Sequence, residues 1–295
     1  MRTFVATEAA PTGEPKKTSR AGRNLPAAIS VGAVLGGTVI ATLLFVPQLW
    51  VALVALAIAL ATHEVVRRLR EGGYAVPVIP LLIGGQATIW LTWPYREAGA
   101  LGAFGATVAL CLIWRLLSGG LKGAPVNYTR DVSVTIFLAA WVPLFGAFTA
   151  LLIYPHRGGY HEGAMQVFCM MLGVVASDIG GYTAGVLFGK HPMVPAISPK
   201  KSWEGLSGSL LFSIAVSVLS VHFLAGRALW VGVPLGIMLV ITGTLGDLVE
   251  SQVKRDLGIK DMGTLLPGHG GLMDRIDSIL PSGVAAWLVL ELLAS

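Results

Sequence analysis

Charged residues are scarce in this sequence. Of its 295 residues, 13% are Asp, Glu, Lys or Arg and 54% are hydrophobic. A soluble globular domain carries roughly a quarter charged residues, so this composition excludes that class. Because apolar runs recur along the whole chain, the composition predicts an all-α, polytopic membrane protein.

Cysteine is also rare. Cys111 and Cys169 are far apart, and both fall inside apolar spans. They lack the spacing of metal ligands, so we expect buried thiols that pack like small apolar side chains. The sequence also shows no internal repeat and no separate soluble domain.

The basic residues form no stripe with interleaved aromatic residues, although the net charge is +5. Such a stripe is the footprint of nucleic-acid binding, so we expect no nucleic-acid partner. Lysine and arginine lie instead at the ends of apolar runs, where they determine topology.

The apolar runs predict about nine transmembrane helices, because a helix needs about 20 residues to cross the hydrocarbon of a bilayer. We expect a disordered cytoplasmic tail over residues 1–27, followed by a single transmembrane domain over residues 28–295. Within that domain, residues 28–153 form N-terminal helices, and residues 164–295 form the catalytic helices and cytoplasmic loops. The predicted spans are 28–46, 49–66, 76–93, 99–117, 132–153, 164–189, 206–225, 229–249 and 277–294.

The distribution of charge predicts the orientation. With a cytoplasmic N-terminus, only Arg96, Arg157 and Arg227 fall in loops on the outer side, and the basic loop residues otherwise fall inside. The positive-inside rule therefore favours a cytoplasmic N-terminus. It also places the longer polar loops, 190–205 and 250–276, in the cytoplasm, where nucleotides are available.

The most polar stretch runs from Gly246 to Ser278. Its glycine-rich run at 268–271 lets the backbone approach a ligand closely. Asp274 and Asp277 lie three residues apart at an expected helix start, so their carboxylates share a face. Carboxylate oxygens suit Mg²⁺, whereas basic side chains and glycine backbone suit phosphates. The stretch predicts a site for a metal–polyphosphate, with positive charge from Lys254, Arg255, Lys260 and Arg275.

A second polar stretch includes Asp178 and the run Ser198-Pro199-Lys200-Lys201-Ser202. An ionised carboxylate at the centre of a membrane helix costs about 2.5 to 3.5 kcal/mol, so we expect Asp178 to face a polar cavity and to have a function. The alternative is a structural hydrogen bond to a neighbouring helix. Taken alone, the two lysines are typical of topology determinants or lipid headgroup contacts.

Several motifs together resemble one family. The residues Ser251-Gln-Val-Lys254-Arg255, Lys260-Asp261, His269-Gly270-Gly271 and Asp274-Arg275-Ile276-Asp277 are similar to the signature of phosphatidate cytidylyltransferases, the CDP-diacylglycerol synthases of bacterial membranes. The run from Ser198 to Gly205 looks like a second motif of that family, with Ser202 in place of the usual threonine.

The resemblance implies an enzyme that makes CDP-diacylglycerol and pyrophosphate from phosphatidate and CTP, for phospholipid biosynthesis. A helix C-terminus, where we expect Asp247, is a poor place for an uncompensated carboxylate, so we expect Asp247 and Asp274 to hold Mg²⁺, with Asp277 as a third candidate ligand. The alternative for Asp277 is an ion pair with Arg275 or a lysine. The expected catalytic residues are Asp247, Asp274, Lys254, Arg255 and Asp277. The expected substrate and nucleotide contacts are Asp178, Ser198, Lys200, Lys201, Ser202, Lys260, Asp261, His269, Gly270, Gly271 and Arg275. We expect His269 to contact phosphate or nucleotide and not to act as a general base, since such transfers depend mainly on positioning and charge.

The same resemblance suggests a homodimer in the bacterial cytoplasmic membrane, with the active site facing the cytoplasm, and a monovalent cation such as K⁺ beside Mg²⁺. Two alternatives stay open: a CTP-dependent kinase of a polyprenol-type lipid alcohol, and an ion-coupled transporter. The pair His63-Glu64 lacks the second histidine of a zinc protease. We therefore expect Glu64 to pair with Arg67 or Arg68.

Overall fold

The computed structural model describes residues 25–120, 123–156, 158–266 and 270–293. Apart from one small hairpin, the regular elements of these residues are helices. The helices are α1 (Leu25–Phe45), α2 (Leu49–Glu71), α3 (Val78–Trp90), α4 (Thr92–Leu117), α5 (Tyr128–Ala139), α6 (Phe145–Leu151), α7 (Tyr160–Phe188), α8 (Trp203–Phe223), α9 (Gly232–Asp256), α10 (Met273–Ile276) and α11 (Ile279–Trp287), and the strands are β1 (Pro192–Val194) and β2 (Ser198–Ser202).

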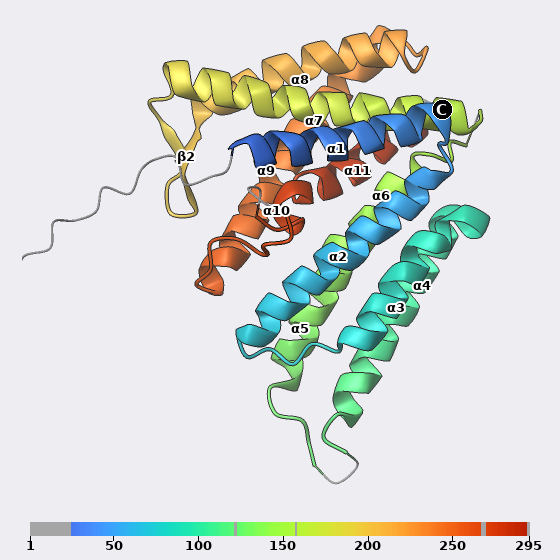
Figure 1. Ribbon diagram of the computed structural model, residues 1–295, viewed down its shortest axis with the longest axis vertical. Coiled ribbons are helices and arrows are strands. Elements are labelled where there is room, and N and C mark those ends of the chain that lie inside the picture. Colours follow the sequence, from blue (N-terminus) through green and yellow to red (C-terminus); the bar gives the residue numbers. More distant parts are fainter. Residues whose placement is uncertain (1–24, 121–122, 157, 267–269, 294–295) are drawn as a thin grey trace, which may run out of the picture.

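The helices form two groups that meet in the middle of the molecule (Figure 1). Helices α2 to α5 run beside one another in one group, and α7 and α8 run beside each other in the other, next to α1. Helices α9 and α11 pack against the second group, and α11 also contacts α6 of the first.

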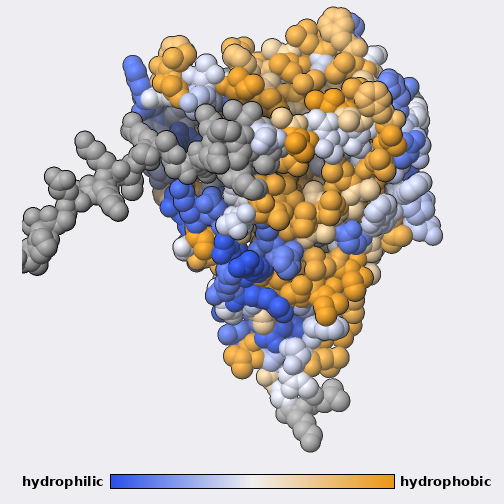
Figure 2. All heavy atoms as spheres, in the orientation of Figure 1, coloured by the Kyte–Doolittle hydropathy of each residue, from blue (hydrophilic) through white to orange (hydrophobic). Residues whose placement is uncertain are grey.

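The prediction of an all-α membrane protein with about nine crossings is confirmed. Among the described residues, six helical segments are long and apolar enough to span a membrane, and Gly32–Phe45 and Val78–Trp90 are shorter apolar helices. The ninth crossing is α11, which continues as a π-helical turn over Leu288–Leu293. Figure 2 shows hydrophobic side chains over much of the surface, with hydrophilic ones gathered over the ends of α2 and α9. Large apolar side chains such as Phe45, Leu211 and Phe223 are exposed, which is typical of a surface that contacts lipid.

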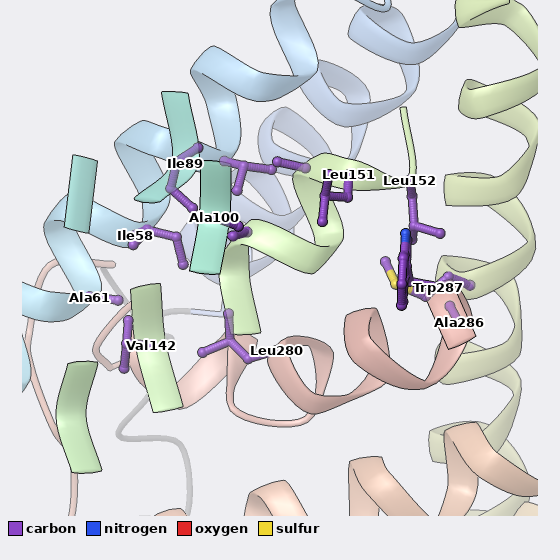
Figure 3. Close-up of a cluster of buried hydrophobic side chains, with 14 of the residues drawn as sticks. Ile58, Ala61, Ile89, Ala100, Val142, Leu151, Leu152, Leu280, Ala286 and Trp287 are labelled. Atoms are coloured by element: carbon purple, nitrogen blue, oxygen red, sulfur yellow. The ribbon is translucent and has the colours of Figure 1, made fainter. Parts of the chain in front are cut away.

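The two groups are joined by a buried apolar cluster between α2, α3, α6 and α11 (Figure 3). Ile58 and Ile89 come from the first group, and Leu280 and Trp287 from α11. The indole Nε1 of Trp50 donates a hydrogen bond to the Thr149 carbonyl over 2.8 Å, which satisfies a polar group inside this cluster. The free thiols of Cys111 and Cys169 are buried, as expected.

The structure differs from the prediction in several places. Helix α4 begins at Thr92, seven residues before the predicted span. Residues 192–202, predicted as part of a loop, form the antiparallel hairpin β1–β2. The span 132–153 contains a π-helical turn at Ala140–Leu144, which includes Pro143. Proline has no backbone N–H to donate, and the wider turn accommodates it within the helix. Helix α9 continues to Asp256, beyond the predicted end at 249. The prediction followed the apolar run, whereas the last turns of the helix are polar. Helix α1 begins at Leu25, so the end of the predicted tail is helical; residues 1–24 lie outside the described residues.

Candidate active site

A cavity of about 490 Å³ opens between α7, α8, α9, the hairpin and the α10–α11 junction. Three of its walls come from predicted polar motifs that are far apart in sequence. The predicted site residues that line it are Asp178, Ser198, Lys200, Lys201, Ser202, Asp247, Asp274 and Asp277. Asp178 therefore faces a polar cavity from within an apolar helix, as its desolvation cost requires.

The hairpin carries the two lysines to the cavity. Strand β2 contains both Lys200 and Lys201, and the irregular register between Pro192 and Val194 lets these adjacent side chains line the same cavity. The Lys201 ammonium lies 2.6 Å from Oδ2 of Asp247 on α9. The hydroxyl of Ser202 accepts a hydrogen bond from the Gly205 N–H over 3.1 Å, so this side chain caps the N-terminus of α8.

Three carboxylates gather beside the cavity, and two of them, Asp247 and Asp277, line it. One oxygen from each of Asp247, Glu250 and Asp277 lies within 4.8 Å of the others, and Glu250 and Asp277 are buried. One Glu250 oxygen, Oε1, is buried without a hydrogen-bond partner among the described residues. Like charges at this separation repel unless cations offset them. We call Asp247, Glu250 and Asp277 the carboxylate cluster.

Close helix packing brings the carboxylate cluster together. A Cβ on Gly246 of α9 would overlap the Asp277 carbonyl oxygen and would come within 2.7 Å of Pro281 on α11. The bare glycine therefore lets α9 approach the start of α11 directly beside Asp247. A larger residue at position 246 would separate the carboxylates that the two helices supply.

Asp274 lines the same cavity as Asp247 and is held there by several hydrogen bonds. Its Oδ1 accepts from the Lys254 ammonium over 2.9 Å, and its Oδ2 accepts from the Gly271 N–H over 2.9 Å. The Met262 N–H donates to both oxygens, at 3.2 and 3.0 Å. Lys254 also lies 2.5 Å from Glu250, so it links Asp274 to the carboxylate cluster.

Asp274 and Asp277 both line the cavity, but among the described residues only Asp277 belongs to the carboxylate cluster, whereas Asp274 accepts from Lys254. The assignment of Asp274 as a metal ligand stays a prediction. Asp247 is also not at a helix end: α9 continues more than two turns beyond it, so the helix dipole does not account for its need of a cation. That need comes from Glu250 and Asp277.

The comparisons with known proteins agree with these motifs. The model of the cytidylyltransferase family matches residues 26–293. The chain belongs to this family. The phosphatidate cytidylyltransferase of Mycobacterium leprae is 63% identical over 289 residues, which cover 94% of this chain and 91% of the relative. That of Mycobacterium bovis is 62% identical over 286 residues, with 94% and 92% covered. One from Staphylococcus saprophyticus is 44% identical over 120 residues, or 40% of this chain and 46% of the relative.

The other predicted site residues of this cytidylyltransferase-family chain lie around the cavity and not in its walls. The Arg255 guanidinium donates to the Ile197 carbonyl over 2.8 Å and so holds the tip of the hairpin against α9. Lys260 is exposed, and Asp261 lies beside Gly270. A Cβ on Gly271 would meet the Gly263 N–H and the Asp274 carboxylate, so this glycine is needed for packing within the motif loop. His269 lies outside the described residues.

Two acidic residues were not predicted as site residues. Glu250 joins the carboxylate cluster; its spacing of three from Asp247 on a helix could have indicated this. The expected pairing of Glu64 with Arg67 or Arg68 is wrong. Both arginines pair with Glu71, and Glu64 instead accepts from the Met273 N–H over 3.0 Å. No local pattern could have shown a contact between residues 209 positions apart.

A second, apolar groove of about 440 Å³ lies beside the site. Helices α1, α2, α7 and α11 supply its lining, including Val39, Val54, Met171 and Ile279. Arg275, from the turn that also carries Asp274, lies in its wall. The apolar groove and the polar cavity therefore share the α10–α11 segment of this cytidylyltransferase-family chain.

The packing at Gly246 gives a testable prediction. Gly246→Ala should destabilise the protein by about 1 to 3 kcal/mol, because the added methyl group overlaps backbone that cannot move freely. The matched control is Gly243→Ala, one turn earlier on the same helix face, where an added Cβ would meet its neighbours at 3.6 Å or more. Thermal unfolding in detergent measures both. Equal melting temperatures for the two variants would contradict the packing argument.

Proposed function

We propose that the protein transfers the cytidylyl group of CTP to phosphatidate, which gives CDP-diacylglycerol and pyrophosphate. One observation carries the proposal: Asp247 and Asp277 of the carboxylate cluster and two hairpin lysines line one cavity, in a chain whose family relatives at 62–63% identity are phosphatidate cytidylyltransferases. A transporter would not require a basic hairpin beside that cluster.

The carboxylate cluster fits a divalent cation such as Mg²⁺. All three groups offer hard oxygen ligands, and Glu250 has a buried oxygen that lacks a partner among the described residues. Asp247, Glu250 and Asp277 would hold the ion, and Asp274 would orient Lys254 beside them. Bound there, Mg²⁺ supplies positive charge for the polyphosphate and its leaving group.

The chain's own residues bind and orient the reactants. Lys200 and Lys201 are placed to neutralise the triphosphate of CTP across the cavity from Asp178. A phosphate oxygen of phosphatidate attacks the α-phosphorus of CTP, and the bond from that phosphorus to the bridging oxygen breaks. Pyrophosphate leaves with the electron pair. The reaction then depends on positioning and charge compensation, without a protein nucleophile.

The apolar groove would take the acyl chains of phosphatidate. It lies against the polar cavity, and Arg275 in its wall can face a lipid phosphate. A lipid seated in this way keeps its chains out of water while its headgroup reaches the nucleotide. The groove is accordingly lined almost wholly by apolar side chains.

The remaining features of the function follow from the sequence. The basic loops favour a cytoplasmic active site in the bacterial plasma membrane. A homodimer and a K⁺ ion beside Mg²⁺ remain part of the proposal on the family resemblance alone.

The reaction can be tested with CTP labelled at the α-phosphorus. Protein in detergent with Mg²⁺ and phosphatidate should transfer the label to lipid, and Asp247→Asn or Glu250→Gln should lower the rate by more than about tenfold, because each removes a proposed ligand. Asp256→Asn, at the exposed end of the same helix, is the control and should behave as wild type. In a parallel assay with CTP labelled at the γ-phosphorus, lipid labelled only from that position would indicate a lipid kinase instead, and no labelled lipid in either assay would favour the transporter.

The apolar groove has its own test. Gly36 lines it, and a Cβ there would meet no atom within 4 Å, so Gly36→Leu should fill the groove without disturbing the helix packing. We expect a raised KM for phosphatidate by about tenfold and an unchanged KM for CTP, since only lipid binding is lost. Gly37→Leu is the matched control, because Gly37 is equally open but does not line the groove. Unchanged lipid kinetics in Gly36→Leu would contradict the assignment of the groove.

A further inference from the structure

The C-terminal end of α2 reaches the motif loop from the N-terminal half of the chain. Glu64 accepts a hydrogen bond from the Met273 N–H over 3.0 Å, at the start of α10. One turn later, the Arg68 guanidinium donates through Nε to the Met262 carbonyl over 2.9 Å. Glu64 and Arg68 lie four residues apart on one face of α2. Together they bind both ends of the loop, at Met273 and Met262.

The two loop ends that α2 holds are the ones that fix Asp274. The Met262 N–H donates to Asp274, and Met273 directly precedes it. Both methionine side chains are buried, with 1% and 0% exposure. A shift at either end would therefore move Asp274.

Asp274 in turn holds Lys254, whose ammonium also pairs with Glu250 of the carboxylate cluster. The chain of contacts is thus continuous from α2 to that cluster. Glu64 is itself 9% exposed, and its Oε1 lacks a hydrogen-bond partner among the described residues. Oε2 alone therefore accepts the hydrogen bond from the loop. Burying a carboxylate with a single backbone N–H as its partner costs free energy. This cost indicates that the hydrogen bond from Glu64 to the loop has a role beyond stability.

We propose that Glu64 and Arg68 are positioning residues for cytidylyl transfer. They fix the ends of the loop between Met262 and Met273, and through Asp274 they orient Lys254 toward the carboxylate cluster. The first helices, which carry no motif of their own, thereby act on the reaction without touching the substrates.

The test compares Arg68→Leu with Arg67→Leu. Both variants remove a partner of Glu71, but only Arg68 contacts the loop. Arg68→Leu and Glu64→Leu should lower kcat by about tenfold to a hundredfold, as the loss of a supporting contact typically does. Arg67→Leu should keep the wild-type kcat. Glu64→Gln keeps a carbonyl oxygen for the Met273 N–H and should restore most of the rate.

Hydrogen exchange provides a readout apart from activity. In detergent, the amides of Met262 and Met273 should exchange faster in Glu64→Leu and Arg68→Leu, while the apolar helices keep wild-type exchange and the melting temperature is unchanged. A wild-type kcat in both leucine variants would overturn the proposal. So would a loss of rate shared by Arg67→Leu, or a loss accompanied by faster exchange throughout the protein, since either indicates general destabilisation.

The kinetic part of this test rests on the proposed function, whereas the exchange part does not. A wild-type protein that makes no CDP-lipid, but whose loop amides still depend on Glu64 and Arg68, would overturn the proposed function alone. Loop amides indifferent to both residues, in a protein that makes CDP-lipid, would overturn the positioning role alone.

Discussion

Compensation of negative charge at the edge of an apolar bundle is the constraint on which this structure depends. One oxygen from each of Asp247, Glu250 and Asp277 lies within 4.8 Å of the others, where the polar part of α9 approaches the start of α11. Lys201 from the hairpin and Lys254 from α9 reach this group directly. The hairpin, the single turn of α10 and the close approach at Gly246 all serve to bring these charges together.

The molecule divides its work between a polar cavity and an apolar groove. The cavity has lysines and carboxylates, whereas the groove has apolar walls and Arg275. A reaction between a water-soluble nucleotide and a lipid needs a polar and an apolar environment side by side, so that the lipid headgroup can reach the nucleotide. The α10–α11 segment borders both, with Asp274 and Asp277 in the cavity and Arg275 in the groove.

Much of the fold and part of the site could be predicted from the sequence. Apolar runs give the helices because membrane crossing fixes their length and composition. Asp178 could be assigned to a polar site because an ionised carboxylate in an apolar helix has a high desolvation cost. Lys201 could be assigned to it from the motif between Ser198 and Gly205. The pairing of Asp247 with Asp274 could not be tested by spacing, because it depends on where α10 ends and how α9 and α11 approach. Glu64 shows the limit most clearly: its partner Met273 is a backbone N–H from the other half of the chain.

The central claim is that Asp247, Glu250 and Asp277 form the cation site. Mn²⁺ is a spectroscopic substitute for Mg²⁺ at oxygen-ligand sites, so its binding can be followed by electron paramagnetic resonance in detergent. The account predicts bound Mn²⁺ in the wild type and at least about tenfold weaker binding in Glu250→Gln, because a ligand is removed. Wild-type Mn²⁺ binding in Glu250→Gln, together with its loss in Asp274→Asn, would contradict the account and restore the pair Asp247 and Asp274 as the ligands.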